Sequence, residues 1–138
     1  DTAWFKIEAT SPITGFELIG TADWNQVAGF YGIGARKKEG IFAKIERNGG
    51  WTYLVLANTE NSQATVTLTA YTDSGTQVAT TTFTLNGHAK VEQAAQQFFS
   101  SQNIATATYI GFSSTKELVG LQLNGSADET MLDGLAGL

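Results

Sequence analysis

The sequence contains no cysteine, and only one proline, one histidine and one methionine occur among its 138 residues. Without cysteine there is no disulfide framework and no thiol chemistry. The single His88 disfavours a zinc site, because several carboxylates would have to supply the remaining ligands. The longest apolar runs are far shorter than the roughly 20 residues that a membrane-spanning helix needs. We therefore expect a domain held together by its own hydrophobic core, for which a chain of this length is sufficient.

Charged residues are also scarce: they make up 15% of the chain, and the net charge is −5. A chain with net negative charge is a poor partner for nucleic acid and for anionic membrane surfaces, so we expect neither. Threonine, serine, asparagine, glutamine and glycine supply most of the polar character. Such a surface is common in extracellular β-modules, and we expect an extracellular or cell-surface location. The chain starts inside a strand-like pattern without a signal peptide, so we expect residue 1 to be a processed or engineered start.

One stretch occurs twice, at residues 13–30 and again at 118–135. Superposition of the two copies gives six identities in eighteen positions, against roughly one expected from average residue usage. The identical pairs are Gly15/Gly120, Leu18/Leu123, Gly20/Gly125, Ala22/Ala127, Asp23/Asp128 and Gly29/Gly134. Upstream, Trp4, Phe5, Ile7 and Thr10 align with Tyr109, Ile110, Phe112 and Thr115. The repeated piece is therefore about thirty residues long, with convergence of two similar hairpins as the alternative explanation.

A period near 105 residues fits one small domain per repeat. The chain then consists of the tail of one unit, followed by a complete unit that ends in the same tail. We expect residues 1–138 to form a single β-sandwich domain, in which hairpin 1–30 is related to 106–135. Within the repeated frame, Gly20 and Gly125 are expected to adopt positive φ, and Asp23 and Asp128 to accept hydrogen bonds from the backbone that follows them.

Alternation of apolar and polar residues predicts strands along most of the chain. It is clearest at 64–71, where Val66, Leu68 and Ala70 point inward and β-branched threonines point outward. Further strands are expected at 3–9, 13–19, 27–33, 41–47, 51–57, 78–85, 105–112 and 118–123, before an apolar end at 131–138. The basic cluster at 36–40 is expected to be a solvated loop, and Ser113-Ser114-Thr115 a turn.

One short helix is predicted at 91–99, because Val91, Ala94, Ala95 and Phe98 have helical spacing. Eight or nine short strands with regular turns and almost no helix are typical of an all-β antiparallel sandwich. A small β-barrel is the alternative architecture.

Part of the chain resembles a module found in tandem in bacterial secreted and surface proteins. The residues that carry the resemblance are Gly-Trp-Thr-Tyr-Leu-Val-Leu-Ala-Asn at 50–58, the strand at 64–71, Asp73-Ser74-Gly75, and Ser114 to Gly120 with its Ser-x-x-x-Leu-x-Gly pattern. The resemblance covers residues 41–125 and implies an Ig-like β-sandwich repeat within a larger exported protein. The immunoglobulin Cys, Trp and Cys signature is missing, so "Ig-like" describes architecture only. The resemblance supplies no catalytic residues.

No catalytic constellation stands out in the sequence. His88 follows Asn86-Gly87 in a predicted turn, no Gly-x-Ser-x-Gly elbow is present, and no spacing selects a pair of carboxylates. We therefore expect no enzyme activity and no cofactor. A calcium site is the one metal hypothesis, because Asp23, Asp128, Glu129 and Asp133 lie in or beside the repeated loops and carboxylates suit Ca²⁺. Aspartates that only cap the turns are the favoured interpretation.

Three aromatic residues are the candidate ligand-binding residues: Trp24, Trp51 and Tyr53. Trp24 stands in a polar loop where its repeat equivalent is Glu129, and exposed rings can stack on sugars. Rings that cover a sandwich edge are the simpler interpretation. The sequence thus favours a non-catalytic structural or interaction module of a larger extracellular bacterial protein, whose partners are neighbouring repeats or another protein. A carbohydrate-binding module, with a polysaccharide as ligand, is the alternative.

Overall fold

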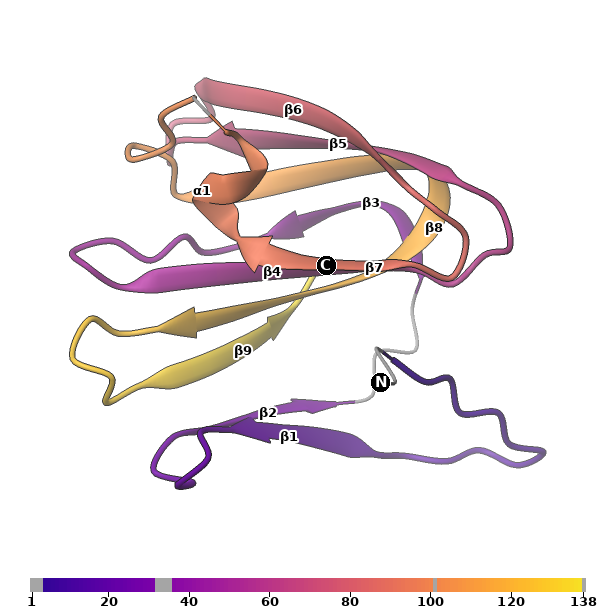
Figure 1. Cartoon of the computed structure of the whole chain (residues 1–138). Coiled ribbons are helices and arrows are strands. Elements are labelled where there is room, and N and C mark those ends of the chain that lie inside the picture. Colours follow the sequence, from indigo (N-terminus) through magenta and orange to yellow (C-terminus); the bar gives the residue numbers. More distant parts are fainter. Residues whose placement is uncertain (1–3, 32–35, 101, 138) are drawn as a thin grey trace.

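A computed structural model describes residues 4–31, 36–100 and 102–137 of the chain (Figure 1). These residues form nine strands and one helix, and every strand pairing is antiparallel. The elements are β1 (Phe16–Gly20), β2 (Val27–Tyr31), β3 (Lys37–Phe42), β4 (Trp51–Asn58), β5 (Ala64–Tyr71), β6 (Gln77–Leu85), β7 (Lys90–Ala94), α1 (Ala95–Phe98), β8 (Tyr109–Gly125) and β9 (Leu132–Ala136). The predicted all-β antiparallel fold with one short helix is confirmed.

Strand β8 is the spine of the larger sheet, which has the order β6-β5-β8-β4-β7. Its first half pairs with β5 on one side and with β3 on the other. Its second half, from Leu118 onward, pairs with β4 on one side and with β9 on the other. Because the partners change halfway along 17 residues, the sheet curls into a half-barrel (Figure 1).

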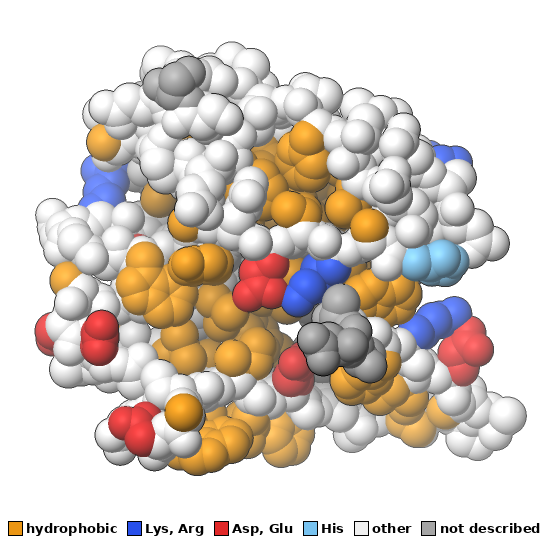
Figure 2. All heavy atoms as spheres, viewed as in Figure 1, with side chains coloured by type: hydrophobic (Ala, Val, Ile, Leu, Met, Phe, Trp, Pro, Cys, Tyr) orange, Lys and Arg blue, Asp and Glu red, His pale blue; other side chains and the backbone are white. Residues whose placement is uncertain are grey.

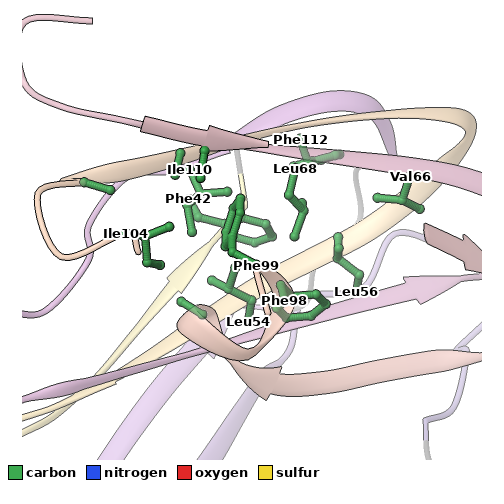
Figure 3. Packing of buried hydrophobic residues seen from close by; sticks show 14 of the residues in the cluster. Phe42, Leu54, Leu56, Val66, Leu68, Phe98, Phe99, Ile104, Ile110 and Phe112 are labelled. Carbon is green, nitrogen blue, oxygen red and sulfur yellow. The ribbon is translucent and has the colours of Figure 1, made fainter. Parts of the chain in front are cut away.

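The hydrophobic core fills the concave side of this curl (Figure 3). Alternate residues of β4, β5 and β8 point into it, because successive side chains of a strand face opposite sides. Phe42, Leu56, Leu68 and Ile110 are fully buried there, and α1 adds Phe98 at the open end. The inward Val66, Leu68 and Ala70 of β5 are buried as the alternation predicted.

Strands β1 and β2 form a separate two-stranded sheet. Figure 1 shows this hairpin as a layer lying against β9, on the side away from the core. The hairpin therefore covers part of the outer face of the sheet and does not extend its hydrogen-bonded edge.

Several sequence predictions were wrong. Residues 4–9 form no strand, and their side chains are mostly exposed; Ala3 lies outside the described residues. The helix expected at 91–99 is β7 followed by the four residues of α1, because β7 pairs with β4 along its whole length. The turn expected at Ser113-Ser114-Thr115 is continuous strand within β8.

Two further boundaries differ from the predictions. The basic cluster at 36–40 belongs mostly to β3, which ends at Phe42, so the strand expected at 41–47 lies several residues earlier in the chain. The strand expected at 27–33 is β2, and residues 32 and 33 lie outside the described residues.

Candidate functional site: the twin hairpins

The two copies of the repeated stretch form hairpins with the same pairing. In hairpin 1 (β1–β2), Leu18 pairs with Gly29 and Gly20 pairs with Val27. In hairpin 2 (the end of β8 with β9), the equivalent pairs are Leu123 with Gly134 and Gly125 with Leu132. All five cross-strand pairs of each hairpin correspond after the repeat shift. The repeated sequence thus encodes one register.

The loops that close the hairpins also share their hydrogen bonds. The amide of Thr21 donates to the carbonyl of Gln26 at 3.1 Å, and that of Ser126 donates to the carbonyl of Met131 at 3.1 Å. Positive φ falls on Trp24 (58°) and Glu129 (57°), which occupy the same loop position.

The expectation of positive φ at Gly20 and Gly125 was wrong; these glycines are required for space. A Cβ on Gly20 would lie 2.9 Å from the carbonyl oxygen of Gln26. A Cβ on Gly125 would lie 2.1 Å from the indole of Trp51, which packs across the strand over that glycine.

Asp23 and Asp128 organise the two loops in the same way. Oδ1 of Asp23 accepts hydrogen bonds from Thr21 Oγ1 (2.6 Å) and from the amide of Asn25 (3.1 Å). Oδ1 of Asp128 accepts from Ser126 Oγ (2.6 Å) and from the amide of Thr130 (3.2 Å). The predicted hydrogen bonds to the following backbone are confirmed.

The same contacts perturb both carboxyl groups. The hydroxyl of Thr21 lowers the pKa of Asp23, with the amide of Asn25 as the second cause. The hydroxyl of Ser126 lowers the pKa of Asp128, followed by the side chain and the amide of Thr130. Donors that bond the ionised form favour that form.

The calcium hypothesis gains no ligand set from this geometry. Within residues 4–31, 36–100 and 102–137, no three acidic or histidine side chains lie close enough together to hold a metal ion. Both carboxylate oxygens of Asp23 and Oδ1 of Asp128 already accept hydrogen bonds within their own turns. A groove of about 610 Å³ does separate the two loops, and its lining is polar: Thr21, Ala22, Asp23, Asn25, Gln26, Asp128 and Glu129.

The surroundings of the hairpins differ. Phe30, which is 7% exposed, lies over Gly134, and a Cβ on that glycine would come within 2.2 Å of the phenyl ring. This contact seats hairpin 1 on β9. The equivalent glycine of hairpin 1, Gly29, is exposed, and a Cβ there would touch only Leu18, at 3.5 Å. Hairpin 1 therefore covers its twin, whereas no described residue outside the hairpin lies over its Gly29.

The candidate aromatic residues do not form a flat platform. Trp51 and Tyr53 meet edge to face, with ring centroids 5.5 Å apart and ring planes at 85°. Trp24 is 65% exposed at the tip of hairpin 1 and lies against Gly20. Trp24 is thus the most exposed of the three, and Tyr53 is 39% exposed.

The most unusual surface lies at the start of the chain. Of the ten large hydrophobic side chains that are exposed among the described residues, seven belong to residues 4–31: Phe5, Ile7, Ile13, Phe16, Leu18, Trp24 and Val27. Figure 2 shows hydrophobic side chains gathered over the lower half of this view, where the hairpins lie. A concentration of exposed apolar side chains of this kind is typical of an interaction site.

His88 contributes to the anchoring of this N-terminal segment. Trp4 stacks on its ring, with centroids 6.2 Å apart, and Trp4 Nε1 donates to its carbonyl oxygen at 3.1 Å. Nε2 of His88 lies 2.7 Å from Oδ1 of Asn61. These contacts give the histidine a packing role.

Sequence reasoning missed a buried polar cluster on the inner face of β8. Thr52 Oγ1 donates to Asn124 Oδ1 at 2.8 Å, and Gln122 Nε2 donates to the carbonyl of Lys44 at 2.7 Å. Oε1 of Gln122 and Nδ2 of Asn124 are buried and have no hydrogen-bond partner among the described residues. The sequence did contain a sign of this cluster: Gln122 and Asn124 are polar, yet they lie on the same face of the strand as Leu118 and Gly120.

No helix in the described part of the chain is long and apolar enough to cross a membrane. Searches with protein-family models and among curated proteins found no match. A structure titled "Crystal Structure of Thermotoga maritima 1070" is similar, with a TM-score of 0.59 and 16% sequence identity over 76% of this chain and 94% of that one. At this identity the similarity shows the fold alone: the chain shares its β-architecture with a protein of Thermotoga maritima.

Proposed function

We propose that this chain is a non-catalytic structural or interaction module of a larger extracellular bacterial protein. The observation that carries the proposal is the concentration of exposed apolar side chains in residues 4–31. A monomeric surface rarely leaves such a patch uncovered, whereas repeat units and interaction modules bury it against a neighbour. The resemblance of residues 41–125 to tandem bacterial modules supports the same function and location.

The shared frame of the hairpins supports a structural role. Its two aspartates bond their own loops, and Gly20 and Gly125 make room for Gln26 and Trp51. The residues that repeat are thus used to build the hairpins, and the partners of such a module would be neighbouring repeats or another protein.

Carbohydrate binding is the second candidate, and one observation favours it. The exposed Trp24 stands in a loop that lines a polar groove, and a ring beside amide and carboxylate groups can recognise a sugar. The edge-to-face arrangement of Trp51 and Tyr53 offers no second parallel ring.

A glycan array followed by titration calorimetry separates the two candidates. The proposed function predicts no saturable binding of any glycan by the wild-type chain. Saturable binding that is lost in Trp24→Ala or Trp51→Ala, while Phe16→Ala retains it, would replace the structural proposal by the carbohydrate-binding one.

A further inference from the structure

The N-terminal segment repeats the sequence of β8 but lacks the neighbours of β8. Phe5, Ile7 and Ile13 align with Ile110, Phe112 and Leu118. The first three side chains are 75%, 67% and 63% exposed, whereas the last three are 0%, 4% and 1% exposed. The same apolar pattern is thus buried in one copy and bare in the other.

Partner strands account for this difference. Residues 110–113 of β8 lie between β3 and β5, and each of them pairs with one residue of either strand. Their inward side chains enter the core with Phe42 and Leu68 (Figure 3). Residues 4–9 have no partner strand on either side in the described structure.

We infer that residues 4–9 are part of the central strand of a second β-unit, and that they insert between strands of that unit equivalent to β3 and β5. The partner is a sheet built like residues 36–105, with an apolar concave face. It has a gap between its equivalents of β3 and β5, at the position that its own β8 would fill. This inference names the partner of the proposed structural module and therefore rests on that proposal.

The apolar and polar faces of the segment suit a position between two strands of such a sheet. Phe5 and Ile7 would point into the core of the partner, as Ile110 and Phe112 do here. Lys6 and Glu8, which already form an ion pair, would take the outward positions of Gly111 and Ser113 and remain in solvent. Trp4 would take the place of Tyr109, which stacks on Tyr71 with centroids 5.2 Å apart.

Insertion would also satisfy the backbone. A strand between two neighbours pairs its amide and carbonyl groups on both sides, whereas residues 4–9 belong to no strand in the described structure. The stacking of Trp4 on His88 and its hydrogen bond to the His88 carbonyl would be replaced by pairing with the partner strands, so these two contacts anchor Trp4 when no partner is bound.

The inference can be tested with a chain of two units, in which a copy of residues 36–105 is fused directly to the N-terminus of residues 1–138. Residue 4 then lies four positions after residue 105 of the added copy, as residue 109 does in the natural sequence. We expect the amides of residues 4–9 to exchange with deuterium at least about 100-fold more slowly than in the single chain. Phe5→Asp should abolish this protection, whereas Glu8→Lys, on the opposite face, should preserve it.

Three results would each overturn the inference. They are unchanged exchange at residues 4–9, an added unit that remains unfolded, and equal behaviour of Phe5→Asp and Glu8→Lys. None of them would restore a glycan ligand, so the proposed function would stand. Conversely, saturable glycan binding through Trp24 would overturn the proposed function without any change in exchange at residues 4–9.

Discussion

Hairpin 1 and hairpin 2 have the same register, the same loop hydrogen bonds and the same aspartate, but opposite surroundings. Hairpin 2 includes the end of the central strand β8, and β4 pairs with that strand on its other side. Hairpin 1 is an isolated pair that lies on its twin through Phe30. The comparison teaches that about thirty residues suffice to specify a hairpin and its turn. Which of its faces is buried depends on the strands that the rest of the chain supplies.

The largest effect is expected from breaking the apolar pattern in each copy. Ile110→Asp places an unpaired carboxylate in the core and should cost more than about 4 kcal/mol, enough to unfold the chain. Phe5→Asp changes an exposed side chain and should alter the free energy of unfolding by less than about 0.5 kcal/mol. Urea denaturation measures both, and equal costs would refute the difference in burial.

The second comparison uses the glycine that the two hairpins share. Gly134→Ala pushes a methyl group into the ring of Phe30 and should weaken the docking of hairpin 1 by about 1–3 kcal/mol. Gly29→Ala adds the same methyl group at the equivalent position, where only Leu18 lies nearby, and should leave docking unchanged.

The rate of chymotrypsin cleavage after Phe16 and Phe30 reports the release of hairpin 1. We expect faster cleavage in Gly134→Ala alone. Equal rates in the two glycine variants would show that Phe30 does not hold the hairpin in place.

The smallest effect is expected from the loop carboxylates. Hydrogen bonds lower the pKa of Asp23 and Asp128 in the folded chain, relative to the ordinary value of about 3.9. Their contribution to stability is therefore present above that ordinary value, and it is lost as the pH falls through the lowered folded pKa.

Carboxyl carbon shifts followed by NMR titration should show both groups titrating below the ordinary range. Thr21→Ala should return the pKa of Asp23 toward that range without affecting Asp128, and Ser126→Ala should do the reverse. An unchanged pKa of Asp23 in Thr21→Ala would show that the Thr21 hydroxyl is not its main hydrogen-bond donor.

Strands with clear alternation could be predicted from the sequence. β5 runs from Ala64 to Tyr71 as predicted, because its inward residues are all apolar and its turns are unambiguous. The helix expected at 91–99 failed because the apolar spacing there fits a strand as well, and pairing with β4 decided the outcome. The sequence from Ser113 to Thr115 predicted a turn, yet Ser113 pairs with both β3 and β5 and Ser114 pairs with β5, so the strand continues through them.

The candidate site was predictable only in part. The hydrogen bonds of Asp23 and Asp128 followed from local chemistry, because an aspartate can bond the amide two residues ahead. The absence of a strand at residues 4–9 could not be predicted, because their alternation is that of a strand but no described strand lies beside them. Alternation of apolar and polar residues indicates which face of a strand favours burial. It does not indicate whether a neighbouring strand is present.

The most direct test of the difference between the hairpins is amide hydrogen exchange in the single chain, measured residue by residue by NMR. The account predicts that the paired amides of residues 121–125 and 132–136 exchange only when the whole domain unfolds. Those of residues 16–20 and 27–31 should exchange at least about 10-fold faster, through local opening of hairpin 1. Equal protection of the two hairpins would contradict the account.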